Sequence, residues 1–438
     1  MLALERRELL ALAVVFAISL PAVTPRIYAS DEIQYFSYLR SLWFDRDVSF
    51  ENEYQHFFDQ NIGRGEGFHA TFLEQYTDAG RRPSFATIGC ALLWAPFYAV
   101  ADGFSHAYIA AVAYGSAFYG LVAVLLSIAA ARRIAGPGLL AGVLIWIGSP
   151  LLFYMYVSPP YSHACSAFAV ALFVTIWLSV RERWTTGGAI ALGLAGALMA
   201  MVREQDMFLA LGPALDFLIT TWLTRPYVGT IRTAVAGLLA FAIGMLPQLL
   251  AYKALNGHFG PSRLVARKMN WVAPHAVDVL FSPAHGFFFW TPLAAFAVAG
   301  LVVLAVRARG AVRRIAWCAL LMVALQVYVS GSVESWTVAG AYGQRRFVAL
   351  TILLTIGLSA LLDAVPRGLW RPALGVALAL CVWWNVALIT AFGTGLMNRQ
   401  RLELGRNAYD AFVTIPQRVP ALAYRYLFDR GSFYQQKL

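Results

Sequence analysis

Residues 106–131 read HAYIAAVAYGSAFYGLVAVLLSIAAA, a run that contains no Asp, Glu, Lys or Arg. An α-helix rises 1.5 Å per residue, so about 20 apolar residues cross the roughly 30 Å of hydrocarbon in a bilayer. Arg132 and Arg133 follow this run directly. A stretch of this length and composition predicts a transmembrane helix.

Apolar runs of similar length recur along the whole chain. Of the 438 residues 60% are hydrophobic and 13% are charged, whereas soluble domains carry about 25% charged residues. The expected spans are 9–28, 106–131, 138–157, 161–180, 186–202, 205–222, 231–252, 286–307, 313–330, 346–363 and 372–394. We therefore expect an all-α polytopic membrane protein with about eleven transmembrane helices, forming a single domain over residues 1–438.

The basic residues predict how the chain is oriented. The net charge is +11, and 14 of the 34 Lys and Arg residues fall in short connectors on one side if the apolar segment 84–102 does not cross. Such connectors are typical of the cytoplasmic side. We expect the N-terminus inside, the C-terminus outside, and segment 84–102 as an in-plane or re-entrant helix. The net positive charge is then explained by the orientation of the chain in the membrane, and no nucleic-acid partner is expected.

This orientation leaves three outer segments. They are a first outer loop at 29–83, a second outer loop at 253–285 and a C-terminal tail at 395–438. The first outer loop has apolar residues on one side of a helical pattern, among them Ile33 and Phe36, which predicts amphipathic helices in the interface.

Asp31 and Glu32 come directly after the first expected span. One interpretation is structural: Ser30 or Asp31 caps the next helix, and acidic residues suit its first turn. The other is catalytic: a carboxylate held at the membrane surface acts as a general base. The two are compatible, because a capped helix start also fixes a side chain.

Three arginines at expected outer ends are candidates for binding a phosphate. Arg345 and Arg346 are either snorkelling residues at lipid headgroups or a phosphate clamp, for which the planar guanidinium group is suited. Gly340 and Gly343 nearby would let the backbone approach a ligand. Arg203 either pairs with the acidic residues that follow it or contacts substrate.

The remaining polar candidates lie at the same expected outer ends. As substrate-binding candidates we take His163, Arg263, Lys268, His285, Glu334, Trp336 and Tyr342. The histidines show no HExxH or similar spacing, and the four cysteines form no CxxC pair, so the sequence gives no convincing metal ligand set. Whether a divalent ion binds near Asp31 is left open by the sequence.

Four features together resemble the GT-C glycosyltransferases, among them the bacterial members related to protein O-mannosyltransferases and to the aminoarabinose transferase of lipid A. They are Asp31-Glu32 opening a long outer loop, the count of eleven spans, FSPAHGFFFWTPL at 281–293 and WTVAGAYGQRRF at 336–347. The resemblance covers most of the chain. It implies a bacterial inner-membrane enzyme with an extracytoplasmic active face, a polyprenyl-phosphate-linked sugar as donor, and a base at Asp31 with Glu32 as its neighbour.

Elementary chemistry agrees with this expectation. An outward-facing transferase needs a membrane-borne donor, because nucleotide sugars are scarce outside the cytoplasm. One base suffices, since a phosphate leaves without the acid that a glycosidase supplies. The chain lacks the large C-terminal soluble domain of some members, so the acceptor, whether glycan, lipid or protein, is not implied.

Two other functions stay open from the sequence. A lipid-linked glycan polymerase or ligase would share the outer face and the arginines, but would not be expected to depend on an acidic pair after the first span. A transporter or flippase would usually carry ionisable residues near the bilayer midplane and interrupted helices in two repeat halves.

Overall fold

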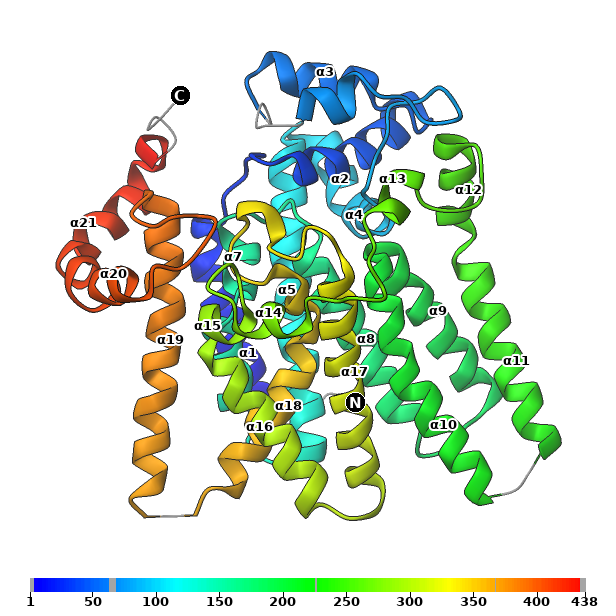
Figure 1. The fold of residues 1–438 in the computed structure, drawn as a ribbon, viewed down its shortest axis with the longest axis vertical. Coiled ribbons are helices and arrows are strands. Elements are labelled where there is room, and N and C mark those ends of the chain that lie inside the picture. The colour runs from blue at the N-terminus through cyan, green and yellow to red at the C-terminus, as the bar shows by residue number, and fades with distance from the viewer. Residues whose placement is uncertain (1–3, 63–67, 225–226, 367, 434–438) are drawn as a thin grey trace. The chain divides into compact units, whose positions relative to one another are not determined.

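The computed structural model describes residues 4–62, 68–224, 227–366 and 368–433, and within these ranges it contains helices and no strand (Figure 1). Five of the described helices are long and apolar enough to cross a membrane. They are α5 (Tyr108–Ala135), α8 (His163–Val180), α17 (Gly310–Ser332), η6 with α18 (Arg345–Ala364) and α19 (Trp370–Thr394). The chain is thus an integral membrane protein by the length and composition of these helices.

A sixth span results if two helices bent by 41° are taken together, Gly229–Gly244 and Leu246–Asn256. Three further apolar helices are shorter, α6 (Gly138–Gly148), α9 (Thr186–Val202) and α16 (Pro292–Arg307). The count of eleven spans stays a prediction.

Prolines explain why two expected spans are broken. Ser149 has φ −131° and ψ 168° between α6 and α7 (Leu151–Tyr156), and it precedes Pro150. Thr291 likewise leaves helical geometry before Pro292, between α15 (Phe287–Trp290) and α16. A residue before proline is disfavoured in the α conformation, and proline has no N–H to donate.

The chain separates into two compact units, each built from segments that are not contiguous in sequence. Unit 1 comprises Met1–Val23, Val124–Val157 and Asn270–Leu438, and unit 2 comprises Thr24–Ala123 and Ser158–Met269. The second outer loop is therefore divided between them at residue 269.

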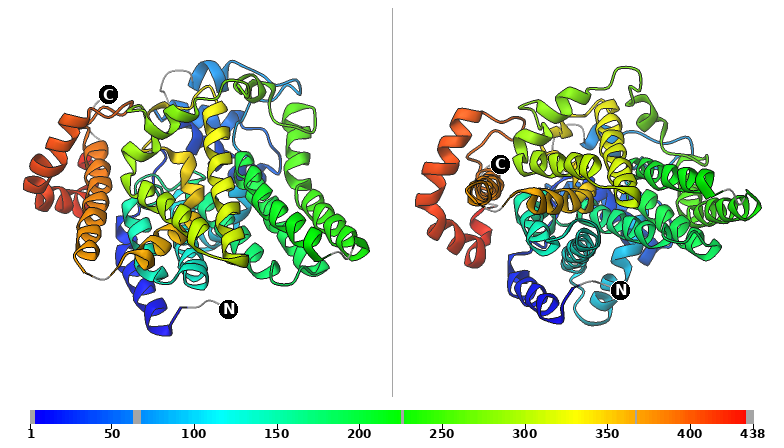
Figure 2. Two further views of the ribbon diagram at one scale, coloured as in Figure 1. Left: turned by 60° about the horizontal axis from the view of Figure 1, so that its bottom comes forward. Right: turned by 90° about the horizontal axis from the view of Figure 1, so that it is seen from below.

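Unit 2 contains the membrane-length helix α8, several shorter apolar helices and the first outer loop. Helix α9 packs between α8 and α11 (Tyr227–Gly244) (Figures 1 and 2). A Cβ atom at Gly193 of α9 would lie 2.2 Å from the backbone oxygen of Gly237 on α11, so only glycine permits this approach. The unit also holds α10 (Leu211–Thr224), α12 (Leu246–Asn256) and α13 (Arg263–Arg267).

The first outer loop packs into unit 2, and its interfacial position stays a prediction. Helix α2 (Ser30–Arg40) buries both apolar and polar residues, including Ile33, Gln34 and Ser37, within unit 2. The two-sided pattern belongs instead to α3 (Glu51–Asp59), where Tyr54 and Phe57 are buried and the intervening polar residues are exposed. The loop also includes η2 (Ser41–Asp45) and η3 (His69–Leu73), while its residues 63–67 lie outside the described ranges.

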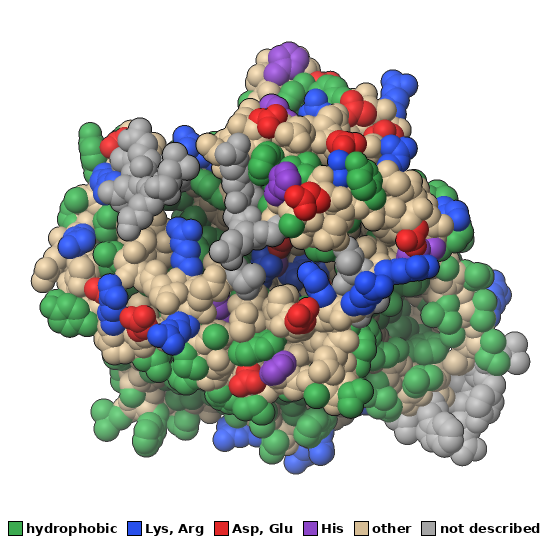
Figure 3. Space-filling model, turned by 45° about the horizontal axis from the view of Figure 1, so that its top comes forward, with side chains coloured by type: hydrophobic (Ala, Val, Ile, Leu, Met, Phe, Trp, Pro, Cys, Tyr) green, Lys and Arg blue, Asp and Glu red, His purple; other side chains and the backbone are tan. Residues whose placement is uncertain are grey.

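The segment 84–102 contains α4 (Gly89–Phe104), a helix that continues through Pro96. Its in-plane or re-entrant orientation stays a prediction. On the face that Figure 3 shows, charged and histidine side chains gather in the upper part, and hydrophobic side chains cover much of the flank below.

Unit 1 is organised around α16, α17 and α18 (Thr351–Ala364). Helices α16 and α18 meet at Gly300 and Gly357, where a Cβ on Gly300 would lie 1.8 Å from the backbone oxygen of Gly357. The unit also contains α1 (Arg6–Ser19), η1 (Leu20–Ala22), α14 (Ala276–Phe281) and η5 (Val338–Gly340).

The C-terminal tail is helical as far as it is described, and residues 434–438 lie outside the described ranges. It forms α20 (Leu404–Tyr409), η7 (Asp410–Thr414), α21 (Ile415–Phe428) and η8 (Arg430–Phe433), and η7 and α21 run beside α19 (Figure 2). The Tyr426 hydroxyl donates to the Ala22 oxygen at 2.8 Å, and Arg430 donates to the Val23 oxygen at 2.7 Å. These bonds fasten the tail to η1.

Candidate active site

The predicted site residues fall into two groups of six. Unit 2 holds Asp31, Glu32, His163, Arg203, Arg263 and Lys268. Unit 1 holds His285, Glu334, Trp336, Tyr342, Arg345 and Arg346. The acidic pair and the Arg345-Arg346 pair therefore belong to different units.

The start of α2 is fixed by the carboxylate of Glu32. Its Oε2 atom accepts hydrogen bonds from the backbone N–H groups of Tyr28 (2.6 Å) and Ala29 (3.0 Å), and its Oε1 accepts the Ser158 hydroxyl (2.6 Å). The helix cap is Ala29, with Glu32 at the third helical position reaching back to it. The expectation that Ser30 or Asp31 is the N-cap is therefore wrong, because Glu32 satisfies the unpaired backbone donors instead.

Burial raises the pKa of Glu32 to about 7. The Ser158 hydroxyl and the two backbone N–H groups oppose this by favouring the charged form, and the neighbouring Asp31 adds to the rise. Glu32 is fully buried with both oxygens engaged. It is therefore built to orient the first turn of α2.

Asp31 lies on that same first turn and is partly exposed. One turn further, the Gln34 side chain donates to the Ser30 oxygen (3.1 Å) and accepts from the Phe85 backbone N–H (2.6 Å). The first turn is thus held from several directions, which restricts where the Asp31 carboxylate can point.

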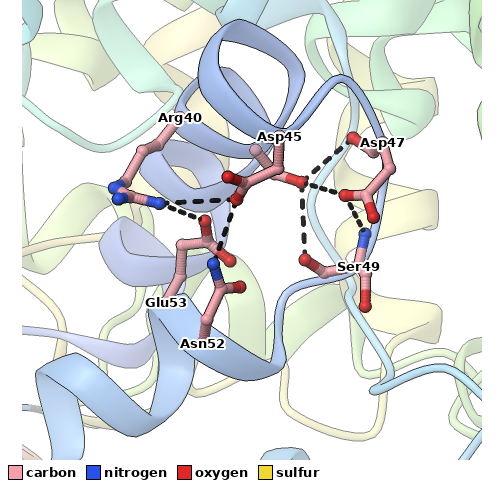
Figure 4. Close-up of polar contacts among 7 residues, drawn as sticks. Arg40, Asp45, Asp47, Ser49, Asn52 and Glu53 are labelled. Carbon is pink, nitrogen blue, oxygen red and sulfur yellow. Dashed lines mark hydrogen bonds and ion pairs between the residues drawn. The ribbon is translucent and has the colours of Figure 1, made fainter.

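The far end of α2 is anchored by a polar network that joins it to η2 and α3 (Figure 4). Arg40 donates to Glu53 at 2.7 Å and lies 3.5 Å from Asp45, which also accepts from Asn52 at 3.0 Å. The Glu53 side chain is fully buried and the Arg40 side chain is 40% exposed, so water is excluded from the carboxylate end of this charge-assisted bond. With both ends fixed, α2 is a rigid platform for Asp31.

Arg203 sits at the end of α9 and contacts the first residue of α8. Its Nη1 atom lies 2.5 Å from Nδ1 of the buried His163, whose ring stacks on Tyr161 with centroids 5.5 Å apart. A guanidinium group only donates, so Nδ1 is the accepting nitrogen. Among the described residues Arg203 has no ion pair with either following acid, so the ion-pair interpretation does not hold.

The two acids after Arg203 bind hydroxyl groups instead. Glu204 accepts the hydroxyl of Tyr252, and Asp206 accepts that of Ser166 at 2.6 Å. Burial raises the pKa of Glu204 to about 7. The Arg203 guanidinium therefore remains available for an anionic ligand.

In unit 1 the stretches 281–293 and 336–347 pack against each other. The Gln344 side chain donates to the His285 oxygen at 3.2 Å, and the rings of Phe287 and Phe347 stack with centroids 4.3 Å apart. His285 stacks on Trp290 at 4.6 Å, and burial lowers the pKa of His285 to about 4. These stretches, 55 residues apart at their starts, form one local structure.

Several unit 1 candidates are engaged in this packing. Tyr342 is 1% exposed, and its hydroxyl donates to Asn385 Oδ1 at 2.9 Å. Arg346 is buried and donates to the backbone oxygen of Ser335 at 3.0 Å and to its hydroxyl at 3.2 Å. Arg345 is partly exposed.

Glu334 is exposed, and Trp336 is partly exposed and stacks on His275 with centroids 5.3 Å apart. In unit 2, Arg263 pairs with Asp78 at 3.4 Å and Lys268 lies over the Phe85 ring at 5.0 Å. Arg263 therefore contacts the first outer loop, and Lys268 contacts the segment 84–102 that follows it.

The glycines of the second stretch have a structural explanation. Gly343 has φ +59° and Gly340 φ +75°, both in the left-handed region. A Cβ at Gly343 would lie 2.9 Å from the Pro150 side chain, so the space beside this glycine is filled by protein. These glycines serve the turn itself.

No group of three His, Cys, Asp or Glu side chains within the described ranges is placed to hold a metal ion. No chemical step is therefore assigned to one. Ser158 and Tyr252 were not predicted as partners of these acids, because a hydroxyl group 126 or 48 residues away leaves no local pattern.

With this geometry in place, the fold can be compared with known structures. The fold is similar to that of two solved structures of ArnT, which confirms the predicted resemblance at the level of the fold. The crystal structure of ArnT from Cupriavidus metallidurans bound to undecaprenyl phosphate matches with a TM-score of 0.57 and 16% identity, over 97% of this chain and 77% of that one. The apo ArnT from the same organism matches with a TM-score of 0.55 and 16% identity, over 96% and 77%.

ArnT is an aminoarabinose transferase. No family model and no curated protein sequence matches the chain.

Proposed function

We propose that this protein transfers a sugar from a polyprenyl-phosphate donor to an acceptor hydroxyl on the extracytoplasmic face of the inner membrane, with inversion at the anomeric carbon. One observation carries the assignment of roles. Of two adjacent carboxylates, Glu32 is buried and occupied by three hydrogen bonds, whereas Asp31 is partly exposed on the same fixed turn. The ArnT-like fold, seen in a protein bound to undecaprenyl phosphate, supports the class of donor.

In the proposed reaction the Asp31 carboxylate takes the proton of the acceptor hydroxyl. The acceptor oxygen forms a bond to the anomeric carbon as the bond from that carbon to the phosphate oxygen breaks. The polyprenyl phosphate leaves with the electron pair of that bond. A positioned base of this kind contributes about 10²–10⁴-fold to the rate.

Arginine would stabilise the phosphate as its negative charge grows. Arg203 is supported as a phosphate ligand because its guanidinium group forms no ion pair with a carboxylate within the described ranges. Arg345 and Arg346 stay predicted phosphate ligands, and Arg346 already has a firm partner in Ser335.

The direct test is to incubate the purified full-length protein with a panel of polyprenyl-phosphate sugars and the matching diphosphates. We expect release or transfer of sugar from a monophosphate donor, reduced at least about 10²-fold in Asp31→Asn and within about tenfold of wild type in Glu32→Gln. Turnover of diphosphates alone would favour a glycan polymerase or ligase. Wild-type turnover by intact Asp31→Asn would remove Asp31 as the base.

A further inference from the structure

A cavity of about 210 Å³ lies in unit 2 between the first and second outer loops. Its walls are residues 75–78 and Pro83 on one side and residues from the stretch 256–267 on the other. A water molecule occupies about 30 Å³ of liquid, so this volume holds several waters or one sugar residue.

The two walls are joined to each other. The Thr77 hydroxyl donates to the backbone oxygen of Leu255 at 2.5 Å, and Arg263 lies 3.4 Å from Asp78. Thr77 also accepts the backbone N–H of Arg81, which closes the turn at one edge of the cavity. The cavity is therefore part of the folded unit.

The lining carries a positive charge. Its single carboxylate, Asp78, is matched by Arg263. Arg267 also lines the cavity, is exposed, and forms no ion pair with any residue the structure describes. His258 adds a further nitrogen group to the lining. A guanidinium without a carboxylate partner suits a carboxylate or phosphate group on a ligand.

The wall formed by the stretch 256–267 contains a buried oxygen atom that could accept a hydrogen bond from a ligand. Asn256 is 2% exposed, and its Nδ2 donates to the Gly260 oxygen at 2.9 Å. Its Oδ1 has no hydrogen-bond partner among the described parts of the chain. Buried polar atoms are normally paired, so a hydroxyl donor is the complementary group. Anionic groups and hydroxyls occur together on acidic sugars.

Contacts connect the cavity region to the helix of the proposed base. Lys268, next to Arg267, lies 5.0 Å from the Phe85 ring centroid, and the Phe85 N–H donates to Gln34 on α2 at 2.6 Å. Gln34 is one helical turn beyond Asp31. Cavity and base thus belong to one packed region of unit 2.

We propose that this cavity is the acceptor subsite and binds an acidic sugar, whose carboxylate or phosphate contacts Arg267 and whose hydroxyl donates to Asn256. The identification of the bound sugar as the acceptor rests on the proposed transferase function. The binding of an acidic sugar does not depend on it.

The test measures binding to the purified full-length protein by ligand-observed NMR at low salt. The probes are trigalacturonate and mannose 6-phosphate, with galactotriose and mannose as their neutral counterparts. We expect at least one acidic probe to bind about tenfold more tightly than its neutral counterpart and to weaken as salt is added. Arg267→Gln should weaken that probe about tenfold, and Arg267→Glu should abolish its binding.

Arg81→Gln is the matched control, because Arg81 belongs to the same loop, is exposed and does not line the cavity. Preference for one acidic probe identifies the carboxylate or the phosphate as the recognised group. Equal binding of neutral and acidic probes, or the same loss in Arg81→Gln and Arg267→Gln, would overturn the proposal. If acidic probes bind through Arg267 but no polyprenyl-phosphate sugar is turned over, the transferase assignment fails while the binding site stands.

Discussion

The Ser158 hydroxyl lies 2.6 Å from Oε1 of Glu32 and joins the start of α2 to a residue 126 positions further along the chain. The other oxygen of this carboxylate accepts two backbone N–H groups. One buried side chain thus closes the helix start and ties it to the segment before α8. In the proposed reaction Glu32 is therefore a positioning residue for Asp31.

Replacing Ser158 by alanine should lower the free energy of unfolding by about 1–3 kcal/mol, because a buried carboxylate oxygen loses its donor. Thermal denaturation of the purified protein in detergent would show the loss as a lower midpoint. Ser105→Ala is the control, since Ser105 is exposed and its hydroxyl accepts only a long bond of 3.4 Å. Equal midpoints for the two variants would contradict the role of the Glu32–Ser158 bond.

Two buried acids predict how stability depends on pH. Burial raises the pKa of Glu32 and of Glu204 to about 7, above the ordinary value of 4.5. At pH values between the ordinary and the raised pKa, the folded protein binds more protons than the unfolded chain. The free energy of unfolding therefore falls as pH rises. The stabilisation is complete below about pH 4 and is lost by passing pH 7.

Thermal midpoints measured from pH 5 to pH 7.5 should therefore decrease, provided that the detergent and salt are constant. Glu204→Gln should reduce the slope, because an amide can still accept the Tyr252 hydroxyl but does not titrate. A midpoint that rises over this range would show that the charged forms of these acids are the stabilised ones.

The sequence predicted the membrane class and several helix positions because apolar length is a local property. Residues 372–394 were expected to span, and α19 runs Trp370–Thr394. Breaks before Pro150 and Pro292 were not predicted, although the physical reason is local as well. The division into two units was beyond reach, since it depends on contacts between segments more than a hundred residues apart.

Arg203→Gln should raise the KM for a polyprenyl-phosphate sugar about tenfold, because one charged donor to the phosphate is lost. Steady-state kinetics at several donor concentrations would separate this effect from a fall in kcat. Arg183→Gln provides the comparison. Arg203 contacts the first residue of α8, whereas Arg183 is an exposed arginine that follows the last residue of this helix. An unchanged KM in a folded Arg203→Gln protein would exclude Arg203 from donor binding.

The site was predicted in part, for reasons that differ between residues. Asp31 and Glu32 stand out because charge directly after an apolar run is visible in sequence. The burial of Glu32 is not visible in sequence, since its hydrogen bonds depend on Ser158 and on the backbone of Tyr28 and Ala29. Tyr342 was chosen for its motif, and its burial against Phe153, with centroids 4.7 Å apart, is a tertiary property.

Substituting alanine at two glycines with similar backbone angles distinguishes the cost of backbone strain from the cost of a packing clash. Gly343 (φ +59°) faces the Pro150 side chain, whereas Gly310 (φ +56°) has open space where a Cβ would be. Gly310→Ala should cost about 1–2 kcal/mol for the left-handed backbone, and Gly343→Ala about 1–3 kcal/mol more for the added contact. The thermal midpoints of both variants test this prediction. An equal fall in the two midpoints would mean that the Pro150 side chain moves away from the added Cβ atom without destabilising the protein.

The proposed chemistry requires Asp31 and Arg345 to face the same compartment, and cysteine labelling tests that requirement. The four native cysteines are buried, so an impermeant maleimide should give little background. Asp31→Cys and Arg345→Cys should react in intact cells, because both positions are expected outside and are partly exposed. Arg313→Cys, in an expected cytoplasmic connector, should react only after permeabilisation. If only one of positions 31 and 345 reacted in intact cells, a donor phosphate held by Arg345 would be separated from the base by the bilayer, and direct displacement between them would be impossible.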